Sequence, residues 1–296
     1  MNAHEPKHFG PFGGRFASVP PFPGKFRLIN GAARLSCLFG SAIRDVYLWP
    51  HTQFTVDLRD RIQRQMWCGS YEPHVTRCLK TILDRGDTFL DIGAHIGYHS
   101  FLAAGLVGEQ GTVYSFEPDP SVYARLKTNL QPFSQAQALE CAVWDSDGEI
   151  SFERSSCLEE SGWGALTTVR KLGTGEEILV HTVSLDSWCE KTRVKAIRAI
   201  KVDAEGSELA FLRGARSTLE RFRPVLLLEV NGLLLKQIEM KPGTLTEELL
   251  SLEYEIYEPS FNRLKRLTSL GKDEFADCIC LPQEQARALY QKLSAG

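Results

Sequence analysis

The fold is decided by residues 88–97, which read Thr-Phe-Leu-Asp-Ile-Gly-Ala-His-Ile-Gly. The apolar run that ends at Asp91 predicts a buried strand, and Gly93 and Gly97 predict a tight turn that opens a helix. Glycine lets the backbone approach a ligand closely because it carries no Cβ atom. The next predicted strand ends on a second acid, Glu117, whose carboxylate could accept hydrogen bonds from a ribose diol. These two strands together predict a pocket for a nucleotide.

The two acids favour a nucleotide with a positive charge over a dinucleotide. Dinucleotide sites hold a pyrophosphate on a G-x-G-x-x-G turn, whereas this turn reads Gly93-x-x-x-Gly97 and follows Asp91. A carboxylate near the phosphate would repel it by about 4 kcal/mol at an effective dielectric constant near 20. S-adenosylmethionine has an ammonium group, a sulfonium and a ribose but no phosphate. It therefore suits both Asp91 and Glu117, and it is the cofactor that these residues predict.

The composition is ordinary for a soluble globular protein. The 296 residues are 43% hydrophobic and 24% charged, with a formal net charge of −3. This balance does not favour nucleic acid or an anionic membrane as a partner, although it leaves room for a local basic patch. No stretch approaches the roughly 20 apolar residues of a transmembrane helix, and the N-terminus does not resemble a signal peptide. We therefore expect a cytoplasmic protein with reduced cysteines.

Strands and helices alternate along most of the chain, which predicts an α/β fold with a mostly parallel sheet covered by helices on both faces. Ligands of such sheets bind at the carboxyl ends of the strands. Four acids end predicted strands and should meet at that edge: Asp91, Glu117, Asp203 and Glu229. The predicted strands are 87–91, 111–117, 137–143, 197–203, 224–230, 253–257 and 277–281, and the predicted helices are 97–107, 120–130, 207–220, 244–251 and a last helix to the C-terminus.

Two segments depart from this alternation. Residues 1–68 begin with a stretch rich in Pro, Gly and Phe, which is either a disordered tail or an arm packed on the main domain, and continue with two short strands within 44–58. Residues 145–183 form a hairpin-like, Gly- and Ser-rich insertion that contains Trp163. We therefore predict a cofactor-binding domain at 69–296. The two departing segments are the candidates for acceptor recognition, because loops on a rigid scaffold carry specificity.

Several sequence blocks occur in order between residues 69 and 230. They are Tyr71-Glu72-Pro73, Asp91-Ile-Gly-Ala-His-Ile-Gly97, Phe116-Glu117-Pro118, Val183-Ser-Leu-Asp-Ser-Trp188, Ile200-Lys-Val-Asp-Ala-Glu-Gly-Ser-Glu208, Leu212-Arg-Gly-Ala215 and Arg223-Pro224 before Glu229. Together these blocks resemble the FkbM family of S-adenosylmethionine-dependent methyltransferases. One departure is His95, where the family usually has asparagine.

The resemblance implies a class I methyltransferase fold, with a seven-stranded sheet that has one antiparallel strand near its end. It also implies an O-methyltransferase that acts on a hydroxyl of a sugar, a glycan or another small natural-product acceptor and leaves S-adenosylhomocysteine as product. Methyl transfer is an in-line displacement in which the protein supplies orientation and electrostatics.

The candidate cofactor-binding residues follow from these positions. Asp91 and the glycine turn should hold the methionine part, Glu117 the ribose and Ala142-Val143 the adenine, while Glu72 could reach the ammonium group. The full set is Glu72, Asp91, Gly93, Ala94, His95, Gly97, Glu117, Pro118, Ala142, Val143 and Asp203.

A hydroxyl acceptor must lose its proton, and four residues are candidates for the base or its support: Glu205, Glu229, His99 and Lys201. Glu205 ranks first because it lies in the turn nearest the expected methyl group, although it could instead cap the following helix. Glu229 could instead pair with Lys201, which would neutralise the acids, and His99 could be a packed helix residue. No metal site is predicted, because Asp203 and Glu205 offer too few ligands for Mg²⁺.

Other functions remain open alternatives. A catalytically inactive cofactor-binding or scaffold protein of the same fold would have the same cofactor site. A nicotinamide-dependent oxidoreductase would need the phosphate turn that this chain lacks. A nucleic-acid methyltransferase is disfavoured by the acidic balance and by the absence of an Asn-Pro-Pro-Tyr motif. The oligomeric state does not follow from the sequence.

Overall fold

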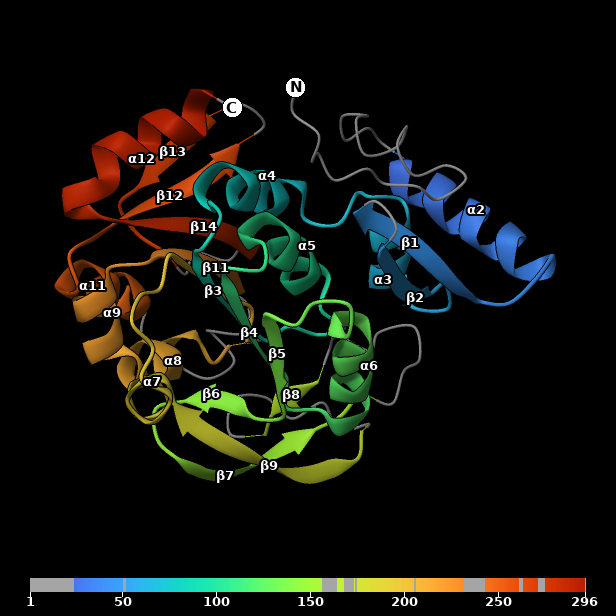
Figure 1. Cartoon of the computed structure of the whole chain (residues 1–296), viewed down its shortest axis with the longest axis horizontal. Coiled ribbons are helices and arrows are strands. Elements are labelled where there is room, and N and C mark those ends of the chain that lie inside the picture. Colours follow the sequence, from blue (N-terminus) through green and yellow to red (C-terminus); the bar gives the residue numbers. More distant parts are fainter. Residues whose placement is uncertain are drawn as a thin grey trace.

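The computed structural model describes residues 24–49, 52–155, 164–167, 173, 175–204, 206–231, 243–260, 263–270 and 275–295. Its centre is an eight-stranded sheet of order β13-β12-β14-β11-β10-β3-β4-β5 (Figure 1). The strands are β3 (Thr88–Ile92), β4 (Thr112–Phe116), β5 (Ala136–Leu139), β10 (Ala199–Val202), β11 (Val225–Asn231), β12 (Tyr254–Ser260), β13 (Arg263–Leu267) and β14 (Phe275–Pro282).

The sheet confirms the predicted fold class. Strands β5, β4, β3, β10 and β11 are parallel neighbours, and β14 is antiparallel to both β11 and β12. Strand β13 pairs with β12 at the edge of the sheet and adds an eighth strand to the seven that were expected.

Helices cover both faces of the sheet, because apolar side chains point alternately to either side of each strand. Phe89 packs in the core under one group of helices, whereas the next residue, Leu90, packs in the core under the other. The first group is α4 (Pro73–Ile82), α5 (Tyr98–Val107), α6 (Pro120–Leu130) and α12 (Gln283–Ala295), and the second is α7 (Leu185–Thr192), α8 (Glu208–Gly214), α9 (Arg216–Phe222) and α11 (Thr244–Ser251).

Two predicted elements are divided in the structure. The helix expected over 207–220 is the pair α8 and α9, which are separated at Ala215. The strand expected over 137–143 is split between β5 and β6 (Ala142–Trp144), and these two strands belong to different sheets. Strand β6 leaves the central sheet to pair with β9 (Glu177–Ser184).

The predicted insertion builds a second, four-stranded sheet of order β6-β9-β7-β8, seen at the bottom of Figure 1. Strands β7 (Gly148–Glu153) and β9 pair antiparallel, as a hairpin-like segment should, and β7 also pairs with β8 (Ala165–Leu166). Trp163 lies outside the described residues.

The N-terminal part packs on the main domain. It consists of α2 (Lys25–Leu38), the antiparallel pair β1 (Ile43–Trp49) and β2 (Thr52–Asp57), and α3 (Arg61–Trp67). The two strands match those expected within 44–58, whereas neither helix was predicted. The Trp49 indole donates to the Phe101 carbonyl of α5, and the Asn129 amide bridges β2 and the loop after β3. Residues 1–23, with the Pro/Gly/Phe stretch, lie outside the described residues.

Candidate active site

A cavity of about 430 Å³ opens at the carboxyl ends of β3, β4, β10 and β11, the edge at which the sequence predicts ligand binding. The chain segments that follow these strands form its floor. Residues of α3 and of the second sheet form parts of its walls. This volume is in the range of small-molecule and cofactor sites.

The loop after β3 is held in one conformation against the end of β4. The backbone N–H groups of Gly93 and Ala94 both donate to the Phe116 carbonyl, at 3.0 and 2.9 Å. Gly93 has φ +75°, and a Cβ at this position would lie 1.9 Å from the Asp203 carbonyl oxygen, so only glycine fits. His95 has φ 51°, in the left-handed region that asparagine and histidine tolerate better than most residues. This conformation explains how His95 can replace the asparagine that is usual in the FkbM family.

Glu117 at the end of β4 is a fixed hydrogen-bonding group on the cavity wall. Its Oε2 accepts from the His95 N–H at 3.0 Å and its Oε1 from the Asp119 N–H at 2.9 Å. Burial raises the pKa of Glu117 to about 8, against the effect of these two N–H donors. The carboxyl group is therefore preorganised, and each oxygen keeps a second lone pair for a ligand.

Asp91 does not line the cavity, contrary to the expectation that its carboxylate meets the ligand. The side chain is buried, and its Oδ2 accepts a hydrogen bond from the Ser100 hydroxyl of α5 at 2.5 Å. Strand β3 continues through Ile92 before the chain turns, and Ile92 and Gly93 are the residues that face the cavity. Asp91 thus joins β3 to α5 and supports the loop from behind.

Three further residues of this region also lie behind the lining: Ala94, Gly97 and His99. His99 is buried, stacks on the Tyr71 ring at 5.3 Å between centroids, and places its Nδ1 3.8 Å from Glu72 Oε2. Burial lowers the pKa of His99 well below its ordinary value. The imidazole is therefore neutral at physiological pH, and the described structure shows it as a packed residue beside the site.

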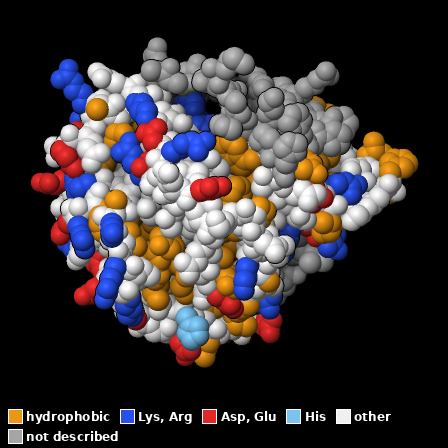
Figure 2. Space-filling view, viewed as in Figure 1, with side chains coloured by type: hydrophobic (Ala, Val, Ile, Leu, Met, Phe, Trp, Pro, Cys, Tyr) orange, Lys and Arg blue, Asp and Glu red, His pale blue; other side chains and the backbone are white. Residues whose placement is uncertain are grey.

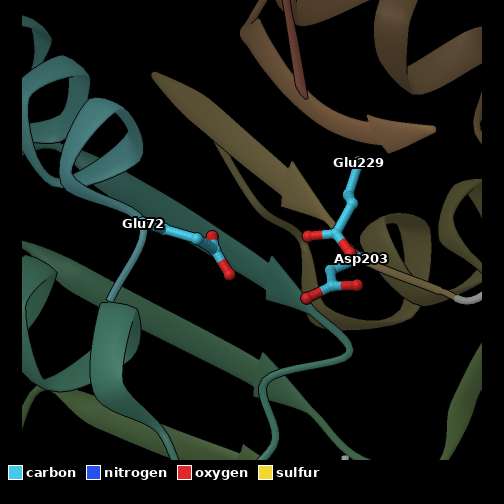
Figure 3. Close-up of side chains that lie close together, drawn as sticks. All are labelled: Glu72, Asp203 and Glu229. Carbon is cyan, nitrogen blue, oxygen red and sulfur yellow. The ribbon is translucent and has the colours of Figure 1, made fainter. Parts of the chain in front are cut away.

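Three carboxylates meet on one side of the cavity (Figure 3). Glu72 comes from the turn before α4, Asp203 follows β10 and Glu229 belongs to β11; their oxygens all lie within 4.8 Å of one another. The left-handed backbone of Glu72, with φ 34°, directs this side chain toward the strands. We call these residues the acidic cluster. Carboxylates at this spacing could receive an organic cation or supply oxygen ligands to a divalent metal ion.

The buried Lys201 side chain neutralises part of the acidic cluster. Its ammonium donates to Asp203 at 2.9 Å and lies 3.8 Å from Glu72. Burial raises the pKa of Glu72 to about 7 and, together with the neighbouring acids Asp203 and Glu72, raises that of Glu229 to about 11. The charge of Lys201 therefore does not keep Glu72 and Glu229 fully ionised at neutral pH. A cationic ligand would favour their ionised forms.

The structure brings most of the predicted residues to the cavity and places others behind its lining. Glu205 lies outside the described residues, and Lys201 lies below the lining. The predicted residues on the cavity are Glu72, Gly93, His95, Glu117, Pro118, Ala142, Val143, Asp203 and Glu229.

Several residues that line the cavity were not predicted from the sequence. Ser207 follows the predicted turn, is buried and lines the cavity, yet its hydroxyl has no hydrogen-bond partner among the described residues. Its position just after the Glu205-Gly206 turn could have suggested it. Asp277 of β14 is the register partner of Glu229 and pairs with His74 at 2.9 Å. Tyr71 was seen only as part of a family motif, and no sequence signal pointed to Gln65, Phe152 or Asn231.

The sheet order, the antiparallel β14 and the cavity at the strand ends define a class I methyltransferase fold. The chain belongs to the FkbM methyltransferase domain family, whose model matches residues 91–256. This membership identifies S-adenosylmethionine as the cofactor. The site fits it: Glu117 and the Ser207 hydroxyl supply polar contacts, the acidic cluster suits a cation, and Phe116, Val143 and Leu166 supply apolar walls.

Three characterised proteins are similar over part of their length. Hexuronic acid methyltransferase AglP of Haloferax volcanii is 29% identical over 150 residues, which are 50% of this chain and 58% of that protein. The 2-O-methyltransferase NoeI of Sinorhizobium fredii is 28% identical over 163 residues, 50% of this chain and 66% of that protein. The 31-O-demethyl-FK506 methyltransferase FkbM of Streptomyces tacrolimicus is 31% identical over 156 residues, 44% and 59% respectively. The chain thus spans about three fifths of the length of these relatives.

Proposed function

We propose that this chain transfers a methyl group from S-adenosylmethionine to a hydroxyl oxygen of a sugar, a glycan or another small natural product. The observation that carries the proposal is a single cavity that combines the anchored Glu117 with the acidic cluster. The similar proteins are named for methyl transfer to a hexuronic acid, to a 2-O position and to a 31-O position. When bound, the cofactor supplies a methyl group on a sulfonium, which an in-line nucleophile can take.

Different residues of the cavity bind different parts of the cofactor. Glu117 accepts from the ribose hydroxyls, and the backbone of Gly93 and His95 borders the same part of the cavity. Ala142 and Val143 form the wall for the adenine, next to Pro118. Glu72 and Asp203 face the ammonium group. Asp91, Ala94 and Gly97 contribute by fixing the loop after β3, because none of them lines the cavity.

The acceptor hydroxyl needs a base within hydrogen-bond reach. Asp203 already accepts from the Lys201 ammonium, whereas the described residues place no cation within hydrogen-bond distance of Glu229. Glu229 is therefore our candidate base among the described residues. Glu205, which the sequence favours, remains a second candidate for the same role.

The acceptor would enter between the N-terminal part and the insertion. Ile62 and Gln65 of α3 and Phe152 and Leu166 of the second sheet line the cavity away from the strand ends. We therefore propose residues 69–296 as the methyltransferase domain, with residues 1–68 and the insertion 145–183 contributing acceptor recognition.

Calorimetric titration of the protein tests the cofactor site. We expect S-adenosylhomocysteine to bind and NAD not to bind, and Glu117→Ala to weaken the binding by about 10- to 100-fold, because the two ribose hydroxyls lose hydrogen bonds of about 0.5–1.5 kcal/mol each. Glu149→Ala, an exposed acid of β7, is the control and should bind normally. Binding of NAD without binding of S-adenosylhomocysteine would refute the proposal.

Transfer itself is tested with labelled S-adenosylmethionine and a panel of hydroxyl acceptors, namely uronic acids, neutral sugars and polyketide alcohols. Label should appear in at least one acceptor as an alkali-stable methyl ether. A protein that binds the cofactor but labels no acceptor would instead be an inactive member of the fold.

Proton release on binding tests the role of Glu72. With a pKa of about 7 in the free protein, Glu72 is about half protonated at neutral pH, and an ammonium group beside it favours the carboxylate. Binding of S-adenosylhomocysteine at pH 7 should therefore release protons, and the affinity should fall as the pH drops below about 7. Calorimetry in two buffers of different ionisation enthalpy measures the release.

Glu72→Gln is the variant for this measurement. This variant should release about half a proton less per molecule of S-adenosylhomocysteine bound, because about half of the Glu72 carboxyl groups of the wild type ionise on binding. Equal proton release by the wild type and the variant would show that Glu72 does not face the ammonium group.

A further inference from the structure

The outer face of α2 is unusually apolar. The helix projects from the body of the molecule beside β1 (Figure 1) and buries Ile29 and Ala33 on its inner face. A surface helix normally turns polar residues outward. Here the outward residues are large and hydrophobic, and Figure 2 shows such side chains at the projecting tip on this side. They are Leu28 (55% exposed), Leu35 (56%), Leu38 (78%) and Phe39 (84%), the last at the C-terminal cap.

The same face is positively charged. Arg27 and Arg34 are exposed and stand seven residues apart, so at 100° per residue they lie on one stripe beside Leu38. Residues 24–44 contain four Lys and Arg and no Asp or Glu, whereas the rest of the chain contains 30 Lys and Arg against 37 Asp and Glu. The net charge of −3 is therefore the sum of a basic segment that contains α2 and an acidic remainder of the chain.

We propose that the outer face of α2 binds the surface of an anionic lipid bilayer. Leu28, Leu35, Leu38 and Phe39 enter the headgroup region, and Arg27 and Arg34 pair with lipid phosphates. An exposed apolar stripe flanked by arginine is the pattern of helices that lie in the membrane interface. Each basic residue near such a surface strengthens the attraction to anionic lipid. Within the described part of the chain, no helix has the length and apolar character needed to cross a bilayer, so the contact is with the surface.

The charge of this face decides against a second copy of the chain as its occupant. A twofold contact would place the same patch on both sides of the interface. It would bring Arg27 and Arg34 of the two copies together, and α2 carries no acid to pair with them. The helix is about 21 Å long, so by itself it offers less than the roughly 800 Å² per partner of a stable protein interface.

Vesicle flotation of the full chain tests the proposal. We expect the protein to float with vesicles of phosphatidylcholine and phosphatidylglycerol, to bind phosphatidylcholine vesicles much less, and to dissociate at high salt. Leu35→Glu should weaken binding by at least about 10-fold, because a buried leucine contributes about 1.5–3 kcal/mol and the new charge is repelled. Arg34→Glu should weaken binding to the anionic vesicles alone.

Leu250→Glu is the matched control, since Leu250 of α11 is also 56% exposed but lies on a different part of the molecule. It should bind as the wild type does. The proposal fails if the wild type does not float with anionic vesicles, or if Leu35→Glu and Leu250→Glu weaken binding equally. It also fails if light scattering shows a wild-type dimer that Leu35→Glu converts to a monomer, because the face would then join two copies.

Discussion

Replacing Glu229 by glutamine is expected to lower the turnover number by about 100-fold or more, while the affinity for S-adenosylhomocysteine changes only a few-fold. Glutamine keeps the size of the side chain but cannot accept the hydroxyl proton. The Glu229 carboxyl group lies at the carboxyl end of β11 beside Asp203 and Glu72, on the wall of the cavity. It can therefore meet an acceptor that approaches from the side of the second sheet.

The pH dependence gives a second readout for this variant. Burial, Asp203 and Glu72 raise the pKa of Glu229 to about 11 in the free protein, so the carboxyl group is protonated at neutral pH. A cation in the cavity lowers this pKa. The wild-type kcat/KM should therefore keep rising with pH in the alkaline range, above the rise near pH 7 that Glu72 causes, and the alkaline rise should be absent in Glu229→Gln.

The matched variant is Glu205→Gln, which tests the other candidate base in the same assay. If Glu205→Gln loses turnover by about 100-fold with unchanged cofactor affinity and Glu229→Gln keeps full activity, then Glu205 is the base and our assignment is wrong.

The sequence predicted the sheet well because its signals are local. The apolar runs before Asp91 and Asp203 mark buried strands, and Gly93 marks a turn that only glycine can make. The acids at Asp203 and Glu229 end parallel strands, so their meeting at one edge follows from topology alone. Asp91 was misplaced because a carboxylate near a strand end can face either side, and the exact end of the strand decides which.

Asp277 shows what the sequence could not supply. The sequence predicts the strand over 277–281, but the rule that ligands bind at the carboxyl ends of parallel strands does not point to its first residues. Strand β14 runs antiparallel to β11, and it therefore brings its first residues to the site, so Asp277 lies opposite Glu229. Helix α2 was missed for a different reason. Its apolar residues face outward, as Leu28 and Leu35 do, as well as inward, as Ile29 does, and this weakens the contrast between faces on which a helix prediction rests.

Replacing Lys201 by methionine is expected to destabilise the protein by about 3–5 kcal/mol at neutral pH, because it leaves buried carboxylates without their cation. The control is Lys191→Met, which removes an ion pair of nearly equal length. The two distances are 2.9 Å for Lys201–Asp203 and 2.7 Å for Lys191–Asp147, but the lysine side chains are 5% and 68% exposed. An exposed pair contributes at most about 1 kcal/mol. Urea unfolding of both variants measures the difference.

The pH dependence of these unfolding curves follows from the pKa of Lys201. Burial alone would lower it, but Asp203, Glu72 and Asp91 outweigh burial and raise it well above 10.5. A raised lysine pKa stabilises the fold fully below its unfolded value, so Lys201 itself should stay fully charged between about pH 5 and 9. In Lys201→Met the carboxylates that have lost their cation take up protons as the pH falls. The loss in free energy of unfolding relative to the wild type should therefore become smaller toward pH 5. Lys201→Arg, which keeps the charge, should recover most of the stability. If Lys201→Met lowers the free energy of unfolding as little as Lys191→Met does, then Lys201 does not stabilise the acidic cluster.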